Sequence, residues 1–499
     1  MTQVIPSVIV TLPARTAAEA RHQIREAQAF GADLAEVRID RFSETERNRL
    51  GTLFPCSLPL VATVRSRAEG GEGPDDAASR AKLFSEIARH PFRWIDVEAS
   101  RDLTAAEGLA PSGGRDLIVS THLRDGAPPE EWSREFRRLV PPGSVRKVVG
   151  RSTVGALLAS VLPGLPPAGE NLLVAHTTGP SGPLLRAWSK RLGLPFVYAA
   201  LPEGAKSSTV AAVEPSQIPV DRLKRFLAAE GTPPLYAVVG RPVAHSRSPA
   251  IHARWMQEDH RPGLYVALEF DGETEFADAL SALVEGGFRG FNVTHPLKAA
   301  AFELADTTGP GAEACGVANT LSVRPDGVEA ENTDLSAILQ RLGELRTEGR
   351  WDGSAAGVIG AGGAARATLA ALRSLGVETF LWARREEARE ALAREFGARA
   401  VGACHGSGPP LVVHATPFGR TESATSPPPD LGWLRPGAHL LDWVYLPDDP
   451  VVRTRAEQAG ATYEDGSRLL VYQAAASYGI WWGSEPSAEQ IATAVEGLR

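Results

Sequence analysis

One lysine lies in the middle of an otherwise apolar, strand-like segment. In the run 144–149 (SVRKVV), a period of two residues puts Lys147 on the same face as Val145 and Val149. Burial disfavours the ammonium form and favours the neutral, nucleophilic amine, which is what Schiff-base formation with a ketone requires. An ion pair with Glu36 or Glu98 is the alternative explanation for this lysine.

Charged side chains also lie in or at the ends of neighbouring strand-like segments. They are Glu36, Arg38, Asp40, Arg65, Asp96, Glu98 and His122. In a parallel barrel the carboxyl ends of the strands meet at one mouth, and that mouth is where barrel enzymes work. We therefore expect these groups to converge there with Lys147.

A glycine-rich turn follows a short apolar strand in the second half of the chain. The run 356–366 (AGVIGAGGAAR) predicts a strand, a turn and a helix whose N-terminus suits a pyrophosphate. Arg384 and Arg385 follow the next strand, where NAD sites usually place an acid, so they favour a 2′-phosphate and NADP. An ordinary solvated helix start is the alternative explanation for these arginines.

Polar clusters precede this turn. Ser246 and Ser248 offer two hydroxyls ahead of a helix, which suits a small carboxylate, and Lys298 and Asp334 supply a base and an acid. Taken singly, turns and helix caps explain these residues equally well.

Eight strand-like runs, with helical stretches between them, must position Lys147 and the charged side chains around it. The runs are 8–11, 34–40, 60–65, 94–98, 117–122, 145–150, 171–177 and 196–200, and apolar spacing predicts helices over 17–30 and 77–89. This repeat favours an α/β fold with an N-terminal (β/α)8 TIM barrel, and a doubly wound open sheet is the second choice.

Composition limits the class of protein. The 499 residues suggest two or three domains, and the net charge of −8 argues against a general nucleic-acid surface. Cys56, Cys315 and Cys404 are widely separated, so we expect neither a disulfide framework nor a metal site. No run is apolar enough to span a membrane and the start lacks a secretory signal, so we expect a cytoplasmic protein.

The first half resembles the type I 3-dehydroquinate dehydratases over roughly 6–226. The resemblance rests on Glu36-Val37-Arg38-Ile39-Asp40 and on Arg65-Ser66-Arg67-Ala68-Glu69-Gly70-Gly71. It implies His122 as general acid/base, Glu69 as the residue that orients it, Lys147 as the Schiff-base lysine and Arg186 as the carboxylate ligand. It also implies substrate contacts by Thr11, Glu36, Arg38, Arg65 and Gln217, with neither metal nor cofactor.

The second half resembles shikimate dehydrogenase over roughly 235–499. The resemblance implies Lys298 and Asp334 as the catalytic pair and substrate contacts by Ser246, Ser248, Thr294, Asn319, Tyr445 and Gln473. It implies NADP binding by Gly360, Ala361, Gly362, Gly363, Ala364, Arg384, Arg385, Thr416, Trp443 and Gly466. Together the two resemblances imply a bifunctional enzyme that dehydrates 3-dehydroquinate and then reduces 3-dehydroshikimate.

The sequence departs from both family patterns at single positions. In the first half Leu123 stands where Asp is common, and Val213 and Ser216 alter a loop that usually reads Ser-Ala-Pro-Gly-Gln, which puts turnover in question. In the second half Ala383 stands for Asn before Arg384, His414 for the Asn of an Asn-x-Thr-Pro turn, and Ala337 for Gly. None of these changes removes a reacting group.

The resemblances also imply domain boundaries. We expect a barrel over 1–230, a linker over 231–234 (GTPP), a shikimate-binding domain over 235–335 with C-terminal helices from about 470, and a Rossmann domain over 336–469. Small-molecule substrates are the expected partners, without nucleic acid or membrane. A quinate/shikimate dehydrogenase with a weakened dehydratase half and a non-catalytic quinate-sensing regulator are the alternatives.

Overall fold

The structure is a computed structural model with two compact units. It describes residues 5–103, 116–167, 172–202, 205, 214–406, 408–419, 428–445 and 450–498, so the predicted effect of Val213 lies outside the described residues. The first unit is Met1–Leu235 with Pro262–Gly287, and the second is Tyr236–Arg261 with Phe288–Arg499. In the part of the chain that is described, no helix has the length and apolar character needed to cross a bilayer.

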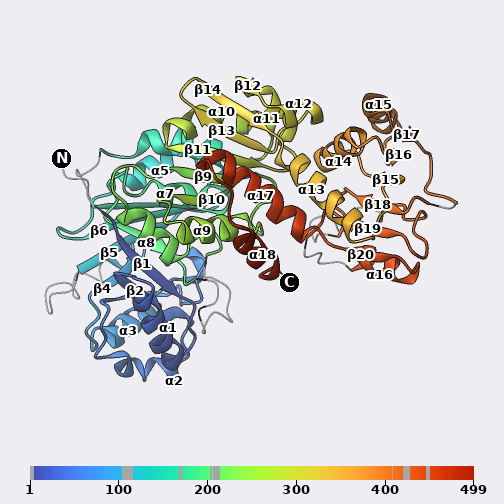
Figure 1. Ribbon diagram of the computed structural model, residues 1–499. Helices are drawn as coiled ribbons and strands as arrows, with labels where there is room; N and C mark the ends of the chain where they lie inside the picture. The colour runs from blue at the N-terminus through green and yellow to red at the C-terminus, as the bar shows by residue number, and fades with distance from the viewer. Residues whose placement is uncertain are drawn as a thin grey trace. The chain divides into compact units, whose positions relative to one another are not determined.

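Eight parallel strands of the first unit form the predicted barrel, in the order β7-β6-β5-β4-β3-β2-β1-β8 (Figure 1). Their bounds are β1 Ser7–Leu12, β2 Leu34–Arg38, β3 Leu60–Thr63, β4 Trp94–Glu98, β5 Asp116–His122, β6 Val145–Arg151, β7 Leu173–Thr178 and β8 Phe196–Ala199. All eight predicted runs are therefore confirmed, and the open sheet is excluded.

Helices connect these strands in the expected repeat. They are α1 Ala17–Ala29, α2 Glu44–Arg47, α3 Ala77–Ile87, α5 Pro129–Phe136, α6 Val154–Ala156, α7 Gly182–Ala187 and α8 Val220–Ala228. The first unit also holds β10 Leu264–Glu269 and α10 Glu273–Glu285. Thr16 and Glu19 form a capping box that fixes the start of α1.

The barrel interior is layered, with apolar residues below and polar residues towards the carboxyl ends of the strands. One buried cluster takes a residue or two from each of seven strands and consists of Ile9, Leu34, Val61, Ile118, Val145, Val174, Phe196 and Tyr198. Two residues further along their strands come Thr11, Glu36, Thr63, Ser120, Lys147 and His176. The period of two thus seats the polar layer on a packed floor.

The barrel has one seam without a backbone ladder. Among the strands that the structure describes, β7 and β8 lie at the two ends of the strand order and do not pair. Side chains bridge them instead: the Tyr198 N–H donates to His176 Nε2 (3.3 Å), and Arg186 donates to the carbonyls of Tyr198 (3.2 Å) and Thr177 (2.9 Å). These bonds satisfy backbone groups that a ladder would otherwise pair.

The second unit contains strands of two sheets. Five strands lie in the order β9-β11-β13-β14-β12, and six parallel strands in the order β17-β16-β15-β18-β19-β20. The first set is β9 Leu235–Gly240, β11 Phe288–Val293, β12 Thr307–Thr308, β13 Thr320–Arg324 and β14 Gly327–Glu331. The second is β15 Ala355–Ile359, β16 Glu378–Trp382, β17 Arg399–Ala400, β18 Leu411–His414, β19 His439–Asp442 and β20 Thr462–Glu464.

The helices of this unit follow the strands. They are α9 Ser248–Glu258, α11 Lys298–Glu303, α12 Pro310–Cys315, α13 Thr333–Thr347, α14 Gly363–Ser374, α15 Glu386–Phe396, α16 Val451–Gln458, α17 Ser467–Trp482 and α18 Ala488–Glu496. Residues of β15, β16, β18, α13 and α14 share one buried apolar core. The predicted strand, glycine turn and helix are present as β15 and α14, so the predicted Rossmann-like α/β architecture is confirmed.

Candidate active sites

A cavity of about 470 Å³ lies within the barrel unit and is lined by polar residues of several strands. The structure brings all nine residues predicted for this half to its wall: Thr11, Glu36, Arg38, Arg65, Glu69, His122, Lys147, Arg186 and Gln217. His176 and Tyr198 also line it and were not predicted. They could have been identified from the sequence, because both are polar residues at positions of β7 and β8 that face the barrel interior.

Lys147 lies in this cavity as a buried, paired amine. Its Nζ is 3.0 Å from Asp96 Oδ2 and 3.8 Å from Glu36 Oε1, and it lies 3.9 Å from the centre of the Tyr198 ring. The ion pair with Glu36 that sequence offered as an alternative is present, but the shorter one is with Asp96. Glu98 does not pair with Lys147; it accepts from Ser66 N (2.7 Å) and Ser66 Oγ (2.8 Å).

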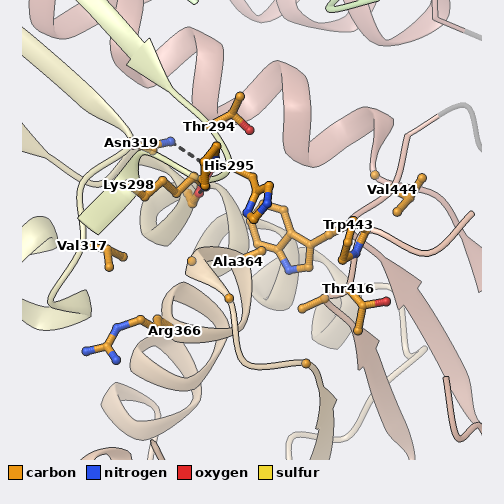
Figure 2. A pocket seen from close by; sticks show the side chains of 18 of the residues that line it. Thr294, His295, Lys298, Val317, Asn319, Ala364, Arg366, Thr416, Trp443 and Val444 are labelled. Atoms are coloured by element: carbon orange, nitrogen blue, oxygen red, sulfur yellow. Dashed lines mark hydrogen bonds and ion pairs between the residues drawn. The ribbon is translucent and has the colours of Figure 1, made fainter. Parts of the chain in front are cut away.

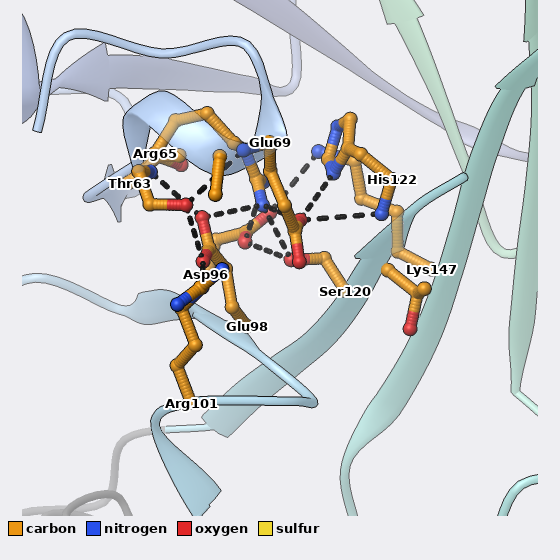
Figure 3. A network of polar contacts seen from close by, with 12 residues as sticks. Thr63, Arg65, Glu69, Asp96, Glu98, Arg101, Ser120, His122 and Lys147 are labelled. Carbon is orange, nitrogen blue, oxygen red and sulfur yellow. Dashed lines mark hydrogen bonds and ion pairs between the residues drawn. The ribbon is translucent and has the colours of Figure 1, made fainter. Parts of the chain in front are cut away.

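Arg65 holds the carboxylates around Lys147 together, as Figure 3 shows. Its Nη1 donates to Glu69 Oε2 (2.9 Å) and Ser120 Oγ (3.1 Å), and its Nη2 donates to Asp96 Oδ1 (2.9 Å). Burial lowers the pKa of Arg65, but the surrounding carboxylates outweigh burial and raise it above its ordinary value. The guanidinium is therefore a fixed charge that positions both Glu69 and Asp96.

His122 and Glu69 form an acid–base pair at the end of β5. His122 Nδ1 is 3.1 Å from Glu69 Oε2, and the His122 backbone N–H donates to the same oxygen (3.2 Å). Burial and the positive charges of Arg65, Lys147 and Arg38 lower the pKa of His122 well below 6.5. Burial raises the pKa of Glu69 to about 7, although Arg65 opposes this. The imidazole is thus neutral, and Nδ1–H donation to Glu69 leaves Nε2 as a free base.

The remaining predicted residues complete the wall of the cavity. Glu36 accepts from Thr11 (2.9 Å) and Thr63 (2.7 Å), and Gln217 donates to Thr11 (3.2 Å). Arg38 instead forms a two-bond ion pair with Asp40, at 2.8 and 2.7 Å. Each of these polar side chains has a fixed orientation because it has a protein partner.

The second unit contains a larger cavity of about 1290 Å³. The residues predicted for the dehydrogenase half all line it: Ser246, Ser248, Thr294, Lys298, Asn319, Asp334, Tyr445, Gln473, Gly360, Ala361, Gly362, Gly363, Ala364, Arg384, Arg385, Thr416, Trp443 and Gly466. His245, His295 and Arg366 line it as well and were not predicted.

Lys298 and Asp334 form an ion pair at this cavity, from the first turns of α11 and α13. The Asn319 side-chain amide nitrogen donates to the other carboxylate oxygen of Asp334 (2.9 Å). The Asn319 side-chain oxygen, Oδ1, accepts from the Thr333 backbone N–H (2.7 Å). Figure 2 shows Lys298 and Asn319 on the same side of the cavity. The pair is therefore held in one orientation, as a proton donor to a substrate oxygen must be.

The two serines lie where α9 begins. Ser248 is buried at the first position of the helix, and its N–H faces Ser246 Oγ at 3.3 Å. Hydroxyls and N–H groups at a helix N-terminus bind anions, because the helix dipole is positive there. This end of the cavity can accept a carboxylate.

The glycine turn fits a dinucleotide. Gly360 has a φ of +133°, and a Cβ there would lie 2.5 Å from the Ala415 carbonyl oxygen. A Cβ on Gly362 would meet no atom within 4 Å and would project into open space beside the start of α14. Arg384 and Arg385 follow β16 on the same cavity wall. The turn leaves room for a pyrophosphate, and the arginines supply charge for a further phosphate.

A buried polar chain ends at the β18 side of this cavity. His414 contacts Asp442 Oδ1 through Nδ1 (2.8 Å) and Thr416 Oγ1 through Nε2 (2.5 Å). Trp443 donates from its indole N–H to Thr368 (3.0 Å). The sequence identified His414 only as a departure from an expected Asn, so its partners were not foreseen.

Two protein-family models match separate parts of the chain. The model of type I 3-dehydroquinase matches residues 8–233, and the model of the shikimate dehydrogenase substrate binding domain matches residues 238–321.

Individual relatives match about half of the chain. Shikimate dehydrogenase (NADP(+)) of Methylobacterium radiotolerans is 38% identical over 266 residues, which cover 50% of this chain and 91% of the relative. That of Acidiphilium cryptum is 37% identical over 264 residues, with 50% and 91% covered.

Solved structures were compared as well. Shikimate 5-dehydrogenase from Thermus thermophilus, in complex with NADP(H) and shikimate, is 32% identical with a TM-score of 0.47, covering 53% of this chain and all of that one. The dehydroquinate dehydratase and shikimate dehydrogenase from S. pombe AroM is 22% identical with a TM-score of 0.42, covering 99% and 98%. On the sequence matches, this chain belongs to the shikimate dehydrogenase family and carries a type I 3-dehydroquinase domain ahead of its dehydrogenase domain.

Proposed function

We propose that the barrel dehydrates 3-dehydroquinate to 3-dehydroshikimate and that the second unit reduces this product to shikimate with NADPH. The observation that carries this proposal is that each cavity is lined by all the residues that the sequence predicts for its reaction. The NADP(+)-dependent shikimate dehydrogenases among the relatives support the second reaction.

In the barrel, Lys147 is the nucleophile. Asp96, 3.0 Å from Nζ, holds the amine in place, and the deprotonated amine adds to the C3 ketone and loses water to give an imine. The imine acidifies the C2 proton, which His122 Nε2 removes. His122 then returns this proton to the departing C1 hydroxyl, so a second water leaves, and a third water hydrolyses the imine and frees Lys147.

The other residues of the barrel bind and orient the substrate. Glu69 keeps the proton of His122 on Nδ1, and Arg186 binds the carboxylate. The remaining substrate ligands are Thr11, Glu36, Arg38, Arg65 and Gln217.

In the second unit, Lys298 and Asp334 are the catalytic pair. They deliver a proton to the C3 oxygen as the carbonyl is reduced, and they stabilise the negative charge that develops on it. Ser246 and Ser248 bind the carboxylate at the start of α9. The ring hydroxyls are bound by Thr294, Asn319, Tyr445 and Gln473.

NADPH supplies the hydride for this reduction when it is bound. Residues 360–364 would hold its pyrophosphate at the start of α14, and Arg384 and Arg385 its 2′-phosphate. Thr416, Trp443 and Gly466 would line the nicotinamide end. We also propose the domain division given above, 1–230, 235–335 with the C-terminal helices, and 336–469.

A two-stage assay on the full chain tests both reactions. With 3-dehydroquinate alone, enone absorbance should appear, and addition of NADPH should then consume the nicotinamide signal. Enone without NADPH oxidation would exclude the second activity. NADPH oxidation with supplied 3-dehydroshikimate, but no enone from 3-dehydroquinate, would exclude the dehydratase activity. The absence of both signals would favour a quinate-sensing regulator.

A further inference from the structure

His414 links the buried core of the Rossmann-like sheet to the large cavity. It ends β18 and is fully buried, as is Asp442 at the end of the neighbouring β19. Thr416, two residues further on, is only half-buried and lines the cavity. The line Asp442–His414–Thr416 therefore runs from inside the sheet to the ligand space.

The direction of each hydrogen bond in this line follows from its neighbours. The Val444 N–H donates to Asp442 Oδ1 (2.9 Å), the same oxygen that faces His414 Nδ1 at 2.8 Å. That oxygen is an acceptor, so Nδ1 carries the proton. In the tautomer with its hydrogen on Nδ1, Nε2 is an acceptor, and the Thr416 hydroxyl donates its hydrogen to Nε2.

Thr416 consequently faces the cavity as an acceptor. Its hydrogen is committed to His414, and one of its two lone pairs accepts from the Phe418 N–H (3.3 Å). In the part of the chain that the structure describes, no further donor reaches Oγ1. One lone pair therefore remains for a ligand that brings a hydrogen-bond donor.

The sheet order indicates which part of a dinucleotide lies at Thr416. Arg384 follows β16, the glycine turn follows β15 and Thr416 follows β18, and these three strands are neighbours in that order. With the 2′-phosphate at β16 and the pyrophosphate at β15, the nicotinamide end lies at β18. Figure 2 shows Thr416 and Trp443 together there, away from Val317 and Arg366.

We propose that Thr416 accepts a hydrogen bond from the carboxamide N–H of the nicotinamide, and that His414, held by Asp442, is the positioning residue that fixes Thr416 in this acceptor orientation. The inference rests on the proposed function, since it concerns the same cofactor. Without His414 the hydroxyl hydrogen loses the acceptor that holds it away from the cavity.

Binding of NADPH to the full chain, followed by NADPH fluorescence, tests this without turnover. T416V removes the hydroxyl at constant shape, and T416S is the matched control that keeps it. H414N can still donate to Asp442 from its amide nitrogen but ends short of Thr416. We expect T416V and H414N each to raise the Kd for NADPH about two- to tenfold, with T416S near wild type.

A double-mutant cycle separates positioning from stability. If His414 acts through Thr416, H414N/T416V binds NADPH no more weakly than the weaker single variant. Additive losses, or an H414N variant that has a lower Tm but the wild-type Kd, would overturn the positioning role. Wild-type protein that does not bind NADPH at all would instead refute the proposed function.

The donor is identified with a reduced acetylpyridine analogue of NADPH, which carries a methyl ketone in place of the carboxamide and so lacks its N–H group. We expect T416V and wild type to bind this analogue equally. A T416V penalty that persists with the analogue would overturn the carboxamide assignment and place the donor on the ribose.

Discussion

Glu69→Gln changes the group that faces His122 Nδ1 from a carboxylate, which only accepts, to an amide that also donates. The structure puts Glu69 Oε2 3.1 Å from Nδ1. Burial raises the pKa of Glu69 from 4.5 to about 7, which corresponds to a cost of about 3 kcal/mol for ionising this carboxyl in the folded protein. Only the ionised carboxylate can accept from Nδ1–H without competing for that position.

We therefore expect the dehydratase kcat/KM of the wild type to fall about tenfold for each pH unit below about 7. In E69Q this acid limb should be absent and the plateau about ten- to a hundredfold lower, because the amide no longer fixes the proton on Nδ1. Initial rates of enone formation from 3-dehydroquinate across pH 5–9 give both numbers. Reduction of supplied 3-dehydroshikimate by the same protein is the control. An acid limb near pH 7 that survives in E69Q would refute this assignment.

The same carboxyl gives a stability trend of predictable sign. Its pKa is about 7 when folded and near 4.5 when unfolded, so between these values the folded state binds more protons. The free energy of unfolding of the wild type should therefore fall as pH rises from 4.5 to 7. Relative to E69Q, the total loss should be about 3 kcal/mol. Urea titrations of both proteins at pH 4.5 and 8 measure this difference, and equal changes in both would contradict it.

Three further variants test the two sites separately. K147A should lower dehydratase activity at least about a thousandfold and abolish borohydride trapping of substrate, with unchanged reduction of 3-dehydroshikimate; retained trapping would exclude Lys147 as the nucleophile. K298A should lower that reduction by about a hundredfold or more, measured as NADPH oxidation, with enone formation unchanged as its control. R384A/R385A should raise KM for NADPH about ten- to a hundredfold but leave KM for NADH unchanged, and parallel loss with both cofactors would refute 2′-phosphate recognition.

Period-two alternation was enough to predict the barrel and its polar layer, because side-chain direction in a strand depends only on local sequence. It could not predict which charges pair. Asp96 and Glu98 share one face of β4, but Lys147 pairs with Asp96, whereas Glu98, two residues further along the strand, accepts from Ser66. Tyr198, far along the chain, packs its ring on the same amine. Such contacts depend on barrel closure, which no local pattern encodes.

In the second unit the glycine turn and the two arginines were predictable because a turn of this geometry leaves a glycine signature. The role of His414 was not. A substitution of Asn by His has no interpretable meaning until the neighbouring strand is known, and Asp442 becomes its partner only through the β18–β19 pairing.

Arg186 joins barrel architecture to substrate binding. Its Nε and Nη1 donate to the carbonyls of Tyr198, Thr177 and Gly182, across the seam where β7 and β8 lack a ladder. Among the described residues nothing bonds to its Nη2, although the side chain lines the cavity. Burial lowers the pKa of Arg186 to about 10, which still leaves it charged at neutral pH. A lysine has one nitrogen and could not serve both sides. The Arg186 guanidinium that bridges the seam is therefore the same group that would present Nη2 to a substrate carboxylate. Substitutions that weaken the contacts across the seam should weaken substrate binding as well.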